Sequence, residues 1–213
     1  MNTADIGIAE TTQDEFDRQL ATLLAKDYPA LAGMSTAKFT EHVEALRDLL
    51  PKASVSDEAA LPFVIVVTHA LVPTASAVEK IVVRKKSGWT DMHDELASYQ
   101  PITGVDVPAA PAYLLTDVDT GEGTLNVRPN DALPVITGAG RTPLTIDEGV
   151  ALATHFPEIL KVRNAFQALA SRADNKRIPS FWISKGAPRL GWCWAGNPHT
   201  WLGSASAAAR YAA

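Results

Sequence analysis

The sequence has little cysteine and no long hydrophobic run. Cys193 is the only cysteine among 213 residues, so no disulfide can form within the chain and no cysteine-rich zinc site can be built. The longest apolar stretch, Leu61–Val67, is far shorter than the roughly 20 residues that a membrane helix requires. The first residues carry neither a basic start nor an apolar run, so they do not form a secretory signal. We expect a soluble cytoplasmic protein that does not act in a membrane.

Motifs for metals and cofactors are also missing. The chain has five histidines, and none of their separations matches the short ligand spacing of a helical zinc site. They are His42, His69, His93, His155 and His199. The pair Gly138 and Gly140 lacks the preceding strand and the third glycine of a dinucleotide loop. We expect no metal and no cofactor, with a metal held by residues distant in sequence as the alternative.

The acidic and basic residues are divided unevenly along the chain. Residues 1–160 hold 11 lysines and arginines against 23 aspartates and glutamates, a balance of −12. Residues 161–213 hold 8 against Asp174 alone, a balance of +7. We expect the basic segment to pair with carboxylates of the acidic one, and the alternative is an unpaired basic patch for an anionic partner. The overall charge of −5 argues against binding duplex nucleic acid.

Helical periodicity dominates the first 50 residues. From Thr12 to Lys26 the apolar residues recur at helical spacing, and the chain should leave this helix at Tyr28-Pro29. A second helix is predicted from Ser35, as its cap, to about Leu50. Two helices this close in sequence should pack side by side. Residues 1–10 are expected to be a flexible end.

The remainder of the chain mixes strands and helices. Phe63–Val67 is a continuous β-branched run and predicts a buried strand, while residues 75–86 fit either a helix or a short strand. Residues 112–127 predict a β-hairpin, Asn130 a helix cap, and Thr145 with Glu148 a capping box. Helices are expected between Asn130 and about Arg172. The fold class is therefore α+β: an N-terminal helix pair on a largely antiparallel sheet, in a single domain spanning 1–213.

The C-terminal segment has the strongest local pattern. Ile178–Ser184 and Leu190–Ala195 flank a loop that suits a hairpin. If Ser184 pairs with Leu190, three tryptophans lie on one face of this hairpin, because directly opposed residues share a face. They are Trp182, Trp192 and Trp194. Cys193 then lies on the other face, where a cysteine is usually a small hydrophobic residue and not a nucleophile.

The same segment resembles a known family. The run from Ile178 to Gly203, and above all GWCWAGNPHTWLG within it, resembles the C-terminus of a bacterial family known only as a domain of unknown function. The similarity extends to segments near Leu61, Ala112, Leu125 and Pro143. It implies a single-domain cytosolic protein and brings no catalytic residue with it.

The candidate site follows from the clustering of tryptophans beside polar and basic groups. Tryptophan stacks on planar rings and cations, and lysine or arginine neutralises anionic groups. The residues expected to bind a ligand are Trp182, Lys185, Arg189, Trp192, Trp194, Asn197, His199 and Trp201. We predict that Asn197, His199 and Trp201 close over one end of the hairpin.

Two classes of function remain open on this basis. The first is a cytosolic binding protein that holds a planar or anionic small molecule at the tryptophan-rich region. The second is an enzyme that uses His199 as its general acid or base, with Asn197 or Lys185 orienting the substrate. The tryptophans could also simply fill a core. The sequence leaves the oligomeric state open.

Overall fold

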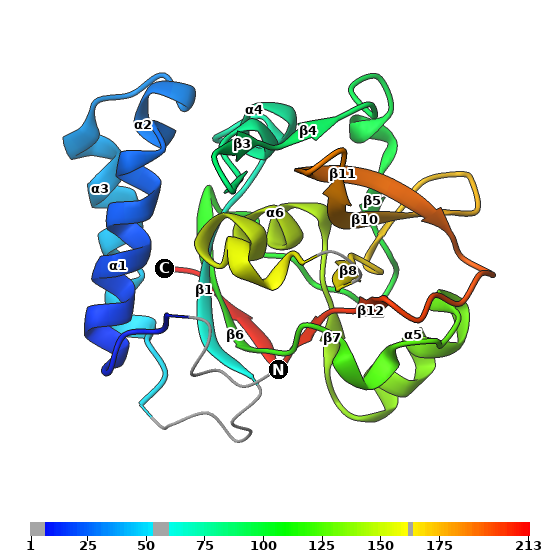
Figure 1. The fold of residues 1–213 in the computed structure, drawn as a ribbon. Helices are drawn as coiled ribbons and strands as arrows, with labels where there is room; N and C mark the ends of the chain where they lie inside the picture. The colour runs from blue at the N-terminus through cyan, green and yellow to red at the C-terminus, as the bar shows by residue number, and fades with distance from the viewer. Residues whose placement is uncertain (1–6, 53–59, 162–163) are drawn as a thin grey trace.

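A computed structural model describes residues 7–52, 60–161 and 164–213 of the chain and has the predicted α+β architecture (Figure 1). The α-helices are α1 (Thr12–Ala25), α2 (Tyr28–Leu31), α3 (Thr36–Glu44), α4 (Thr74–Glu79), α5 (Pro129–Gly138) and α6 (Ile146–His155). Short 3-10 helices lie at Arg47–Leu49, Leu96–Ser98, Glu122–Thr124 and Pro157–Ile159. None of the helices in these ranges is long and apolar enough to cross a membrane.

The strands form two main sheets and three small two-stranded pairs. The first sheet is antiparallel, in the order β1 (Leu61–Val67), β6 (Ala112–Val118) and β14 (Ala209–Tyr211). The second has the order β12 (Leu202–Ser204), β8 (Ala165–Gln167), β10 (Arg177–Ser184), β11 (Ala187–Trp194) and β4 (Trp89–Thr90). The small pairs join β2 (Val82–Val83) to β3 (Lys86–Ser87), β5 (Gln100–Pro101) to β9 (Ser171–Arg172), and β7 (Thr142–Pro143) to β13 (Ser206–Ala207).

The N-terminal helices form as the sequence predicts. Thr11 caps α1 by accepting a hydrogen bond from Asp14, and Ser35 caps α3 in the same way from Lys38. α1 and α3 lie side by side on one side of the first sheet, where α1 contacts β1 and α3 contacts β6 (Figure 1). The second helix is shorter than predicted, since it ends at Glu44 and Arg47–Leu49 continues as a 3-10 turn.

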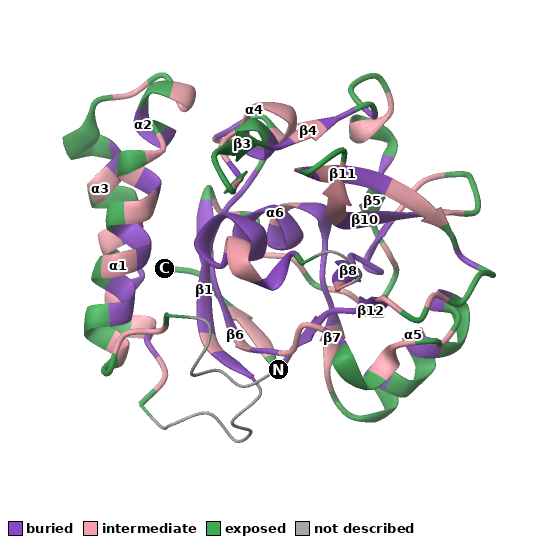
Figure 2. Ribbon diagram, in the orientation of Figure 1, coloured by how far each residue is buried: buried purple, intermediate pink, exposed green. Residues whose placement is uncertain are grey.

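Helix α6 lies between the two main sheets. The predicted capping box is present, with Thr145 and Glu148 bonding each other's backbone N–H groups. Figure 2 shows α6 and β1 buried together. On its other side α6 contacts β10: a Cβ added at Gly149 would lie 2.3 Å from Cε2 of Phe181. The glycine therefore admits the phenylalanine ring that joins the helix to the second sheet.

Two sequence predictions are corrected. Residues 112–127 do not form a hairpin: β6 pairs with β1 and β14, and the segment after it turns into the 3-10 helix Glu122–Thr124. Asp119 and Gly121 cause this turn, since the Asp119 carboxylate accepts from the Gly121 N–H at 2.6 Å and Gly121 has φ of 91°. The α5 helix begins at Pro129, with Arg128 as its N-cap, so Asn130 is already helical.

The ambiguous segment from residue 75 to 86 contains both predicted structures. Thr74–Glu79 is helix α4, and Val82–Val83 pairs with Lys86–Ser87 as a β-hairpin. Gly88 lies directly after this hairpin, where an added Cβ would approach the carbonyl oxygen of Val78 to 2.2 Å. The absence of a side chain at this glycine lets the hairpin fold back over α4.

Candidate functional site

The C-terminal hairpin exists, but its predicted register is wrong. Ser184 pairs with Ala187, so Lys185 and Gly186 alone form the turn. Both have left-handed backbones, with φ of 54° and 77°. This is the geometry of the tight two-residue hairpin turns in which asparagine or glycine usually precedes glycine. A lysine in the first position is not a recognised turn signal, and the sequence therefore suggested a longer loop.

The shorter turn separates the tryptophans. Pairing is displaced by three residues from the predicted register, and an odd displacement moves one strand's side chains to the opposite face. Trp182 now opposes Arg189, whereas Trp192 opposes Pro179 and Trp194 opposes Arg177. Trp182 therefore lies on one face of the hairpin, and Trp192 and Trp194 lie on the other.

On the first face, one arginine lies between two tryptophans. Arg189 is the partner of Trp182 on β10 and of Trp89 on β4, so the three side chains form a row across three strands. The Cζ atom of Arg189 lies 4.8 Å from the ring centre of Trp182 and 4.7 Å from that of Trp89. Asp91 accepts from Nη2 at 2.6 Å, and this bond lowers the pKa of the Asp91 carboxyl group. The arginine is thus held by stacking and by charge.

The Trp182 ring also depends on a glycine. A Cβ added at Gly191 would lie 2.4 Å from the Cη2 atom of Trp182. The indole therefore occupies the space that a side chain at residue 191 would fill, next to Arg189.

On the second face, Arg177 covers the other two tryptophans. Its Cζ atom lies 4.1 Å from the ring centre of Trp192 and 6.0 Å from that of Trp194. Glu95 binds Arg177 at 2.9 Å. Trp194 still has 46% of its surface exposed. Trp182, Trp192 and Trp194 are therefore each associated with an arginine from within the chain.

The remaining predicted site residues lie near the base of the hairpin, away from the Lys185 turn. Asn197 is exposed and follows β11 in a turn, where its backbone N–H donates to the carbonyl of Trp194. The carbonyl of His199 accepts from Asn126 at 2.8 Å, and its ring lies 5.4 Å from that of Trp201. Cys193 is half-buried, and burial raises the pKa of its thiol, which disfavours a nucleophilic thiolate.

A second hairpin tip lies next to the Lys185 turn. Arg84 and Lys85 form the two-residue turn between β2 and β3, with left-handed φ values of 50° and 64°. The Nζ atom of Lys86 donates to the carbonyl of Lys185 at 3.3 Å, which ties the two tips together. The Nζ atom of Lys185 in turn lies 5.5 Å from the ring centre of Trp89.

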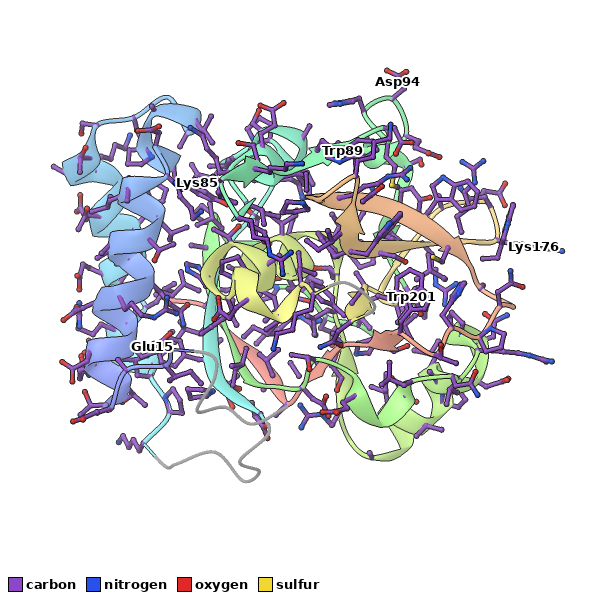
Figure 3. All side chains as sticks on the ribbon, viewed as in Figure 1. Glu15, Lys85, Trp89, Asp94, Lys176 and Trp201 are labelled. Carbon is purple, nitrogen blue, oxygen red and sulfur yellow. The ribbon has the colours of Figure 1, made fainter. Side chains whose placement is uncertain are left out.

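The two tips together form a cationic patch, which we define as Arg84, Lys85, Lys86 and Lys185. All four residues are exposed, and none forms an ion pair with a carboxylate in the described parts of the chain. Figure 3 shows Lys85 and Trp89 on this side of the molecule and Lys176 at the far end of the β10–β11 hairpin. The cationic patch is therefore adjacent to the tryptophan–arginine row and open to solvent.

The expectation that the basic segment pairs with carboxylates of the acidic one is met in part. Arg177, Arg189 and Arg210 pair with Glu95, Asp91 and Glu148, all from the acidic part of the chain. The cationic patch differs from the predicted alternative, because only Lys185 of its four residues belongs to the basic segment. Arg163 lies outside the described residues.

The sequence analysis missed the contribution of Arg84, Lys85, Lys86 and Trp89. A signal was present, because a run of three basic residues stands just before Trp89, the tryptophan outside the C-terminal segment. It was overlooked because nearly 100 residues separate this run from Lys185, and only the folded chain brings them together.

In the described ranges, no group of three or more histidine, cysteine, aspartate or glutamate side chains is arranged to hold a metal ion. Comparison with curated proteins gave no match, and neither did comparison with solved structures. Residues 22–213 match a protein family described as a family of unknown function, DUF5701. This match spans the helices from α2 onward, both sheets and the two hairpin tips. The chain therefore belongs to the DUF5701 family.

Proposed function

We propose that this protein binds a small molecule that carries an anionic group on a planar ring, and that it does so at the cationic patch. The observation that carries the proposal is the gathering of four cations that form no ion pair among the described residues, on a chain with a net charge of −5. Like charges repel, so their concentration at two adjacent tips is unfavourable without an anion between them.

The neighbouring aromatic groups supply the second half of the ligand chemistry. Trp89 and Trp182 are half-buried, and Arg189 is fixed between them. A planar ring can stack on the uncovered parts of such a row, while an anionic group is neutralised by Lys85 and Lys185. Of the residues predicted from sequence, Trp182, Lys185 and Arg189 contribute to this binding site.

The backbone of the tips also favours a functional role. Arg84, Lys85 and Lys185 adopt left-handed conformations in which residues other than glycine and asparagine are uncommon. Glycine or asparagine at these positions would form the same turns with less strain. The presence of long basic side chains at such positions supports the view that the tips require positive charge.

The second candidate is an enzyme that uses His199 as its acid or base. The ring of His199 contacts that of Trp201 but forms no hydrogen bond among the described residues. A histidine without an orienting partner is a weaker base candidate than one held by a carboxylate. Binding at the cationic patch is therefore the function that we favour.

Tryptophan fluorescence tests this proposal with ATP as the probe, since ATP combines a planar ring with a chain of phosphates. We expect ATP to quench fluorescence saturably, with weaker effects from adenosine alone and from tripolyphosphate alone. The double variant Lys85→Ala/Lys185→Ala should weaken ATP binding at least tenfold. Added salt should weaken it as well, because exposed charges are screened.

The matched control removes two exposed lysines elsewhere, Lys38 and Lys176. The Lys38→Ala/Lys176→Ala variant has the same net charge as the patch variant and should bind ATP like the wild type. Equal binding by both variants, or no ATP binding by the wild type, would contradict the proposal.

A further inference from the structure

A separate pocket lies at the N-terminal end of α6. Its volume is about 560 Å³, within the range of roughly 300–1,000 Å³ that is typical of small-molecule sites. Most of its wall is apolar, with Pro73, Leu96, Val107 and Ile146 among the residues that line it. No lysine or arginine is found among the described residues of the wall. The pocket therefore suits a neutral, largely apolar molecule and not a phosphate or carboxylate.

A histidine and an aspartate lie at this pocket in a defined geometry. The Nδ1 atom of His69 is 2.7 Å from Oδ2 of Asp147, and the backbone N–H of His69 donates to the same oxygen at 3.0 Å. Thr74 donates to Oδ1 of Asp147 at 3.4 Å. The side chain of Asp147 is only 14% exposed, whereas that of His69 is 73% exposed. The aspartate is thus fixed from three directions, and the histidine ring extends from it toward water.

This geometry determines the protonation of the imidazole. An ionised carboxylate can only accept hydrogen bonds, so Nδ1 of His69 carries the hydrogen that is shared with Asp147. In the neutral ring the free lone pair is then on Nε2. The hydrogen bond to Asp147, reinforced by its charge, raises the pKa of His69. Asp147, His93 and Tyr99 are the other titratable groups in the pocket wall.

We propose that His69 is a general base that activates water for the hydrolysis of a small, neutral, largely apolar carboxylic ester bound in this pocket. As the water oxygen bonds to the ester carbonyl carbon, Nε2 takes the proton and the carbonyl electron pair moves onto oxygen. The tetrahedral intermediate then re-forms the carbonyl, the bond to the alcohol oxygen breaks, and the imidazolium returns its proton to that oxygen. The products are a carboxylic acid and an alcohol, and Asp147 remains ionised throughout.

The choice of water as nucleophile follows from the surroundings. Among the described residues, the hydroxyl that bonds this pair is that of Thr74, and it donates to Asp147 and not to His69. The exposure of His69 leaves Nε2 accessible to solvent. This site is independent of the cationic patch, so either proposal can fail without affecting the other.

Hydrolysis of p-nitrophenyl butyrate by the full-length protein tests the inference. We expect turnover above the buffer rate, with kcat/KM increasing with pH as His69 loses its proton. His69→Gln should reduce kcat/KM at least tenfold. The variant keeps the backbone bond from residue 69 to Asp147, so the fold should be retained. Asp147→Asn should shift the midpoint of the pH profile downward, because the charge that favours protonated His69 is gone.

Controls come from exposed residues of the same types. His42→Gln and Asp94→Asn should leave both kcat/KM and the pH midpoint unchanged. No turnover by the wild type would overturn the inference. So would a rate that falls equally in His69→Gln and His42→Gln, since surface imidazoles alone would then account for hydrolysis. If Asp147→Asn and the wild type have the same pH midpoint, Asp147 does not act through His69.

Discussion

The side-chain amide of Gln19 forms hydrogen bonds with the backbone of β1 at Phe63 and Ile65, in the place of a neighbouring strand. The Ile65 N–H donates to Oε1 of Gln19 at 2.8 Å, and Nε2 of Gln19 donates to the carbonyl of Phe63 at 3.0 Å. The carbonyl of Ile65 is bonded in turn by Nε2 of His155 at 3.0 Å. β1 is an edge strand covered by helices, so its outward N–H and C=O groups need such partners. Two side chains from different helices supply them.

Replacing Gln19 with leucine should destabilise the protein strongly. Two buried backbone groups would lose their partners, each at a cost of about 1–3 kcal/mol. We expect the free energy of unfolding, measured with urea, to fall by about 2–5 kcal/mol. Gln13→Leu, on the exposed side of α1, should change it by less than about 0.5 kcal/mol. Similar losses in the two variants would show that the amide of Gln19 is not required at the edge of β1.

His155 should make stability depend on pH in a specific window. Burial lowers its pKa to about 3, below the ordinary value of about 6.5. Between these values the unfolded chain binds a proton that the folded chain does not, so stability decreases as the pH falls from about 6.5. The slope from this group is at most about 1.4 kcal/mol per pH unit.

The measurement compares urea unfolding of the wild type and His155→Gln between pH 7 and pH 4.5. Glutamine retains a donor for the Ile65 carbonyl and does not titrate. In the variant, the free energy of unfolding should therefore lose the pH dependence that His155 contributes. His42→Gln should keep the full slope. Parallel stability curves for the wild type and His155→Gln would argue against a neutral buried histidine.

Gly149→Ala tests the junction between α6 and β10. Alanine is the better helix former, yet its Cβ would lie 2.3 Å from the ring of Phe181. We expect a net loss of about 1–3 kcal/mol, as is usual for overpacked cores. Adding Phe181→Leu should restore part of it by making room. Gly138→Ala on α5, where an added Cβ meets nothing within 4 Å, should be neutral or stabilising.

Arg210→Met should expose the role of a buried ion pair near the C-terminus. Arg210 binds the fully buried Glu148 at 2.5 Å, and Tyr113 donates to the same carboxylate at 2.8 Å. Removing the arginine leaves a buried charge uncompensated, which typically costs about 3–5 kcal/mol. Compared with Arg210→Met, the double variant Arg210→Met/Glu148→Gln should regain more than about 1 kcal/mol of the free energy of unfolding, because the glutamine amide is neutral.

Urea unfolding again provides the measurement, with Arg128→Met as the exposed arginine control. No loss of stability in Arg210→Met, or no recovery in the double variant, would mean that the charge of Glu148 is balanced by other groups.

The sequence by itself determined the elements whose signals are local. The helices near Phe16 and Phe39, the strand at Phe63–Val67 and the capping box of Thr145 are all found where periodicity and capping chemistry predict them. In each case residues within a few positions of one another carry the whole signal. The presence of a C-terminal hairpin was predictable for the same reason.

Only the tertiary structure decided the features that depend on distant segments. β6 pairs with β1 and with residues 209–211, the latter more than 90 positions further on, and not with the adjacent segment that propensity favoured. The hairpin register depends on a left-handed Lys185, a conformation that composition does not predict. The two hairpin tips, and likewise His69 and Asp147, meet only after the chain folds, since contacts of this range are set by packing and not by local propensity.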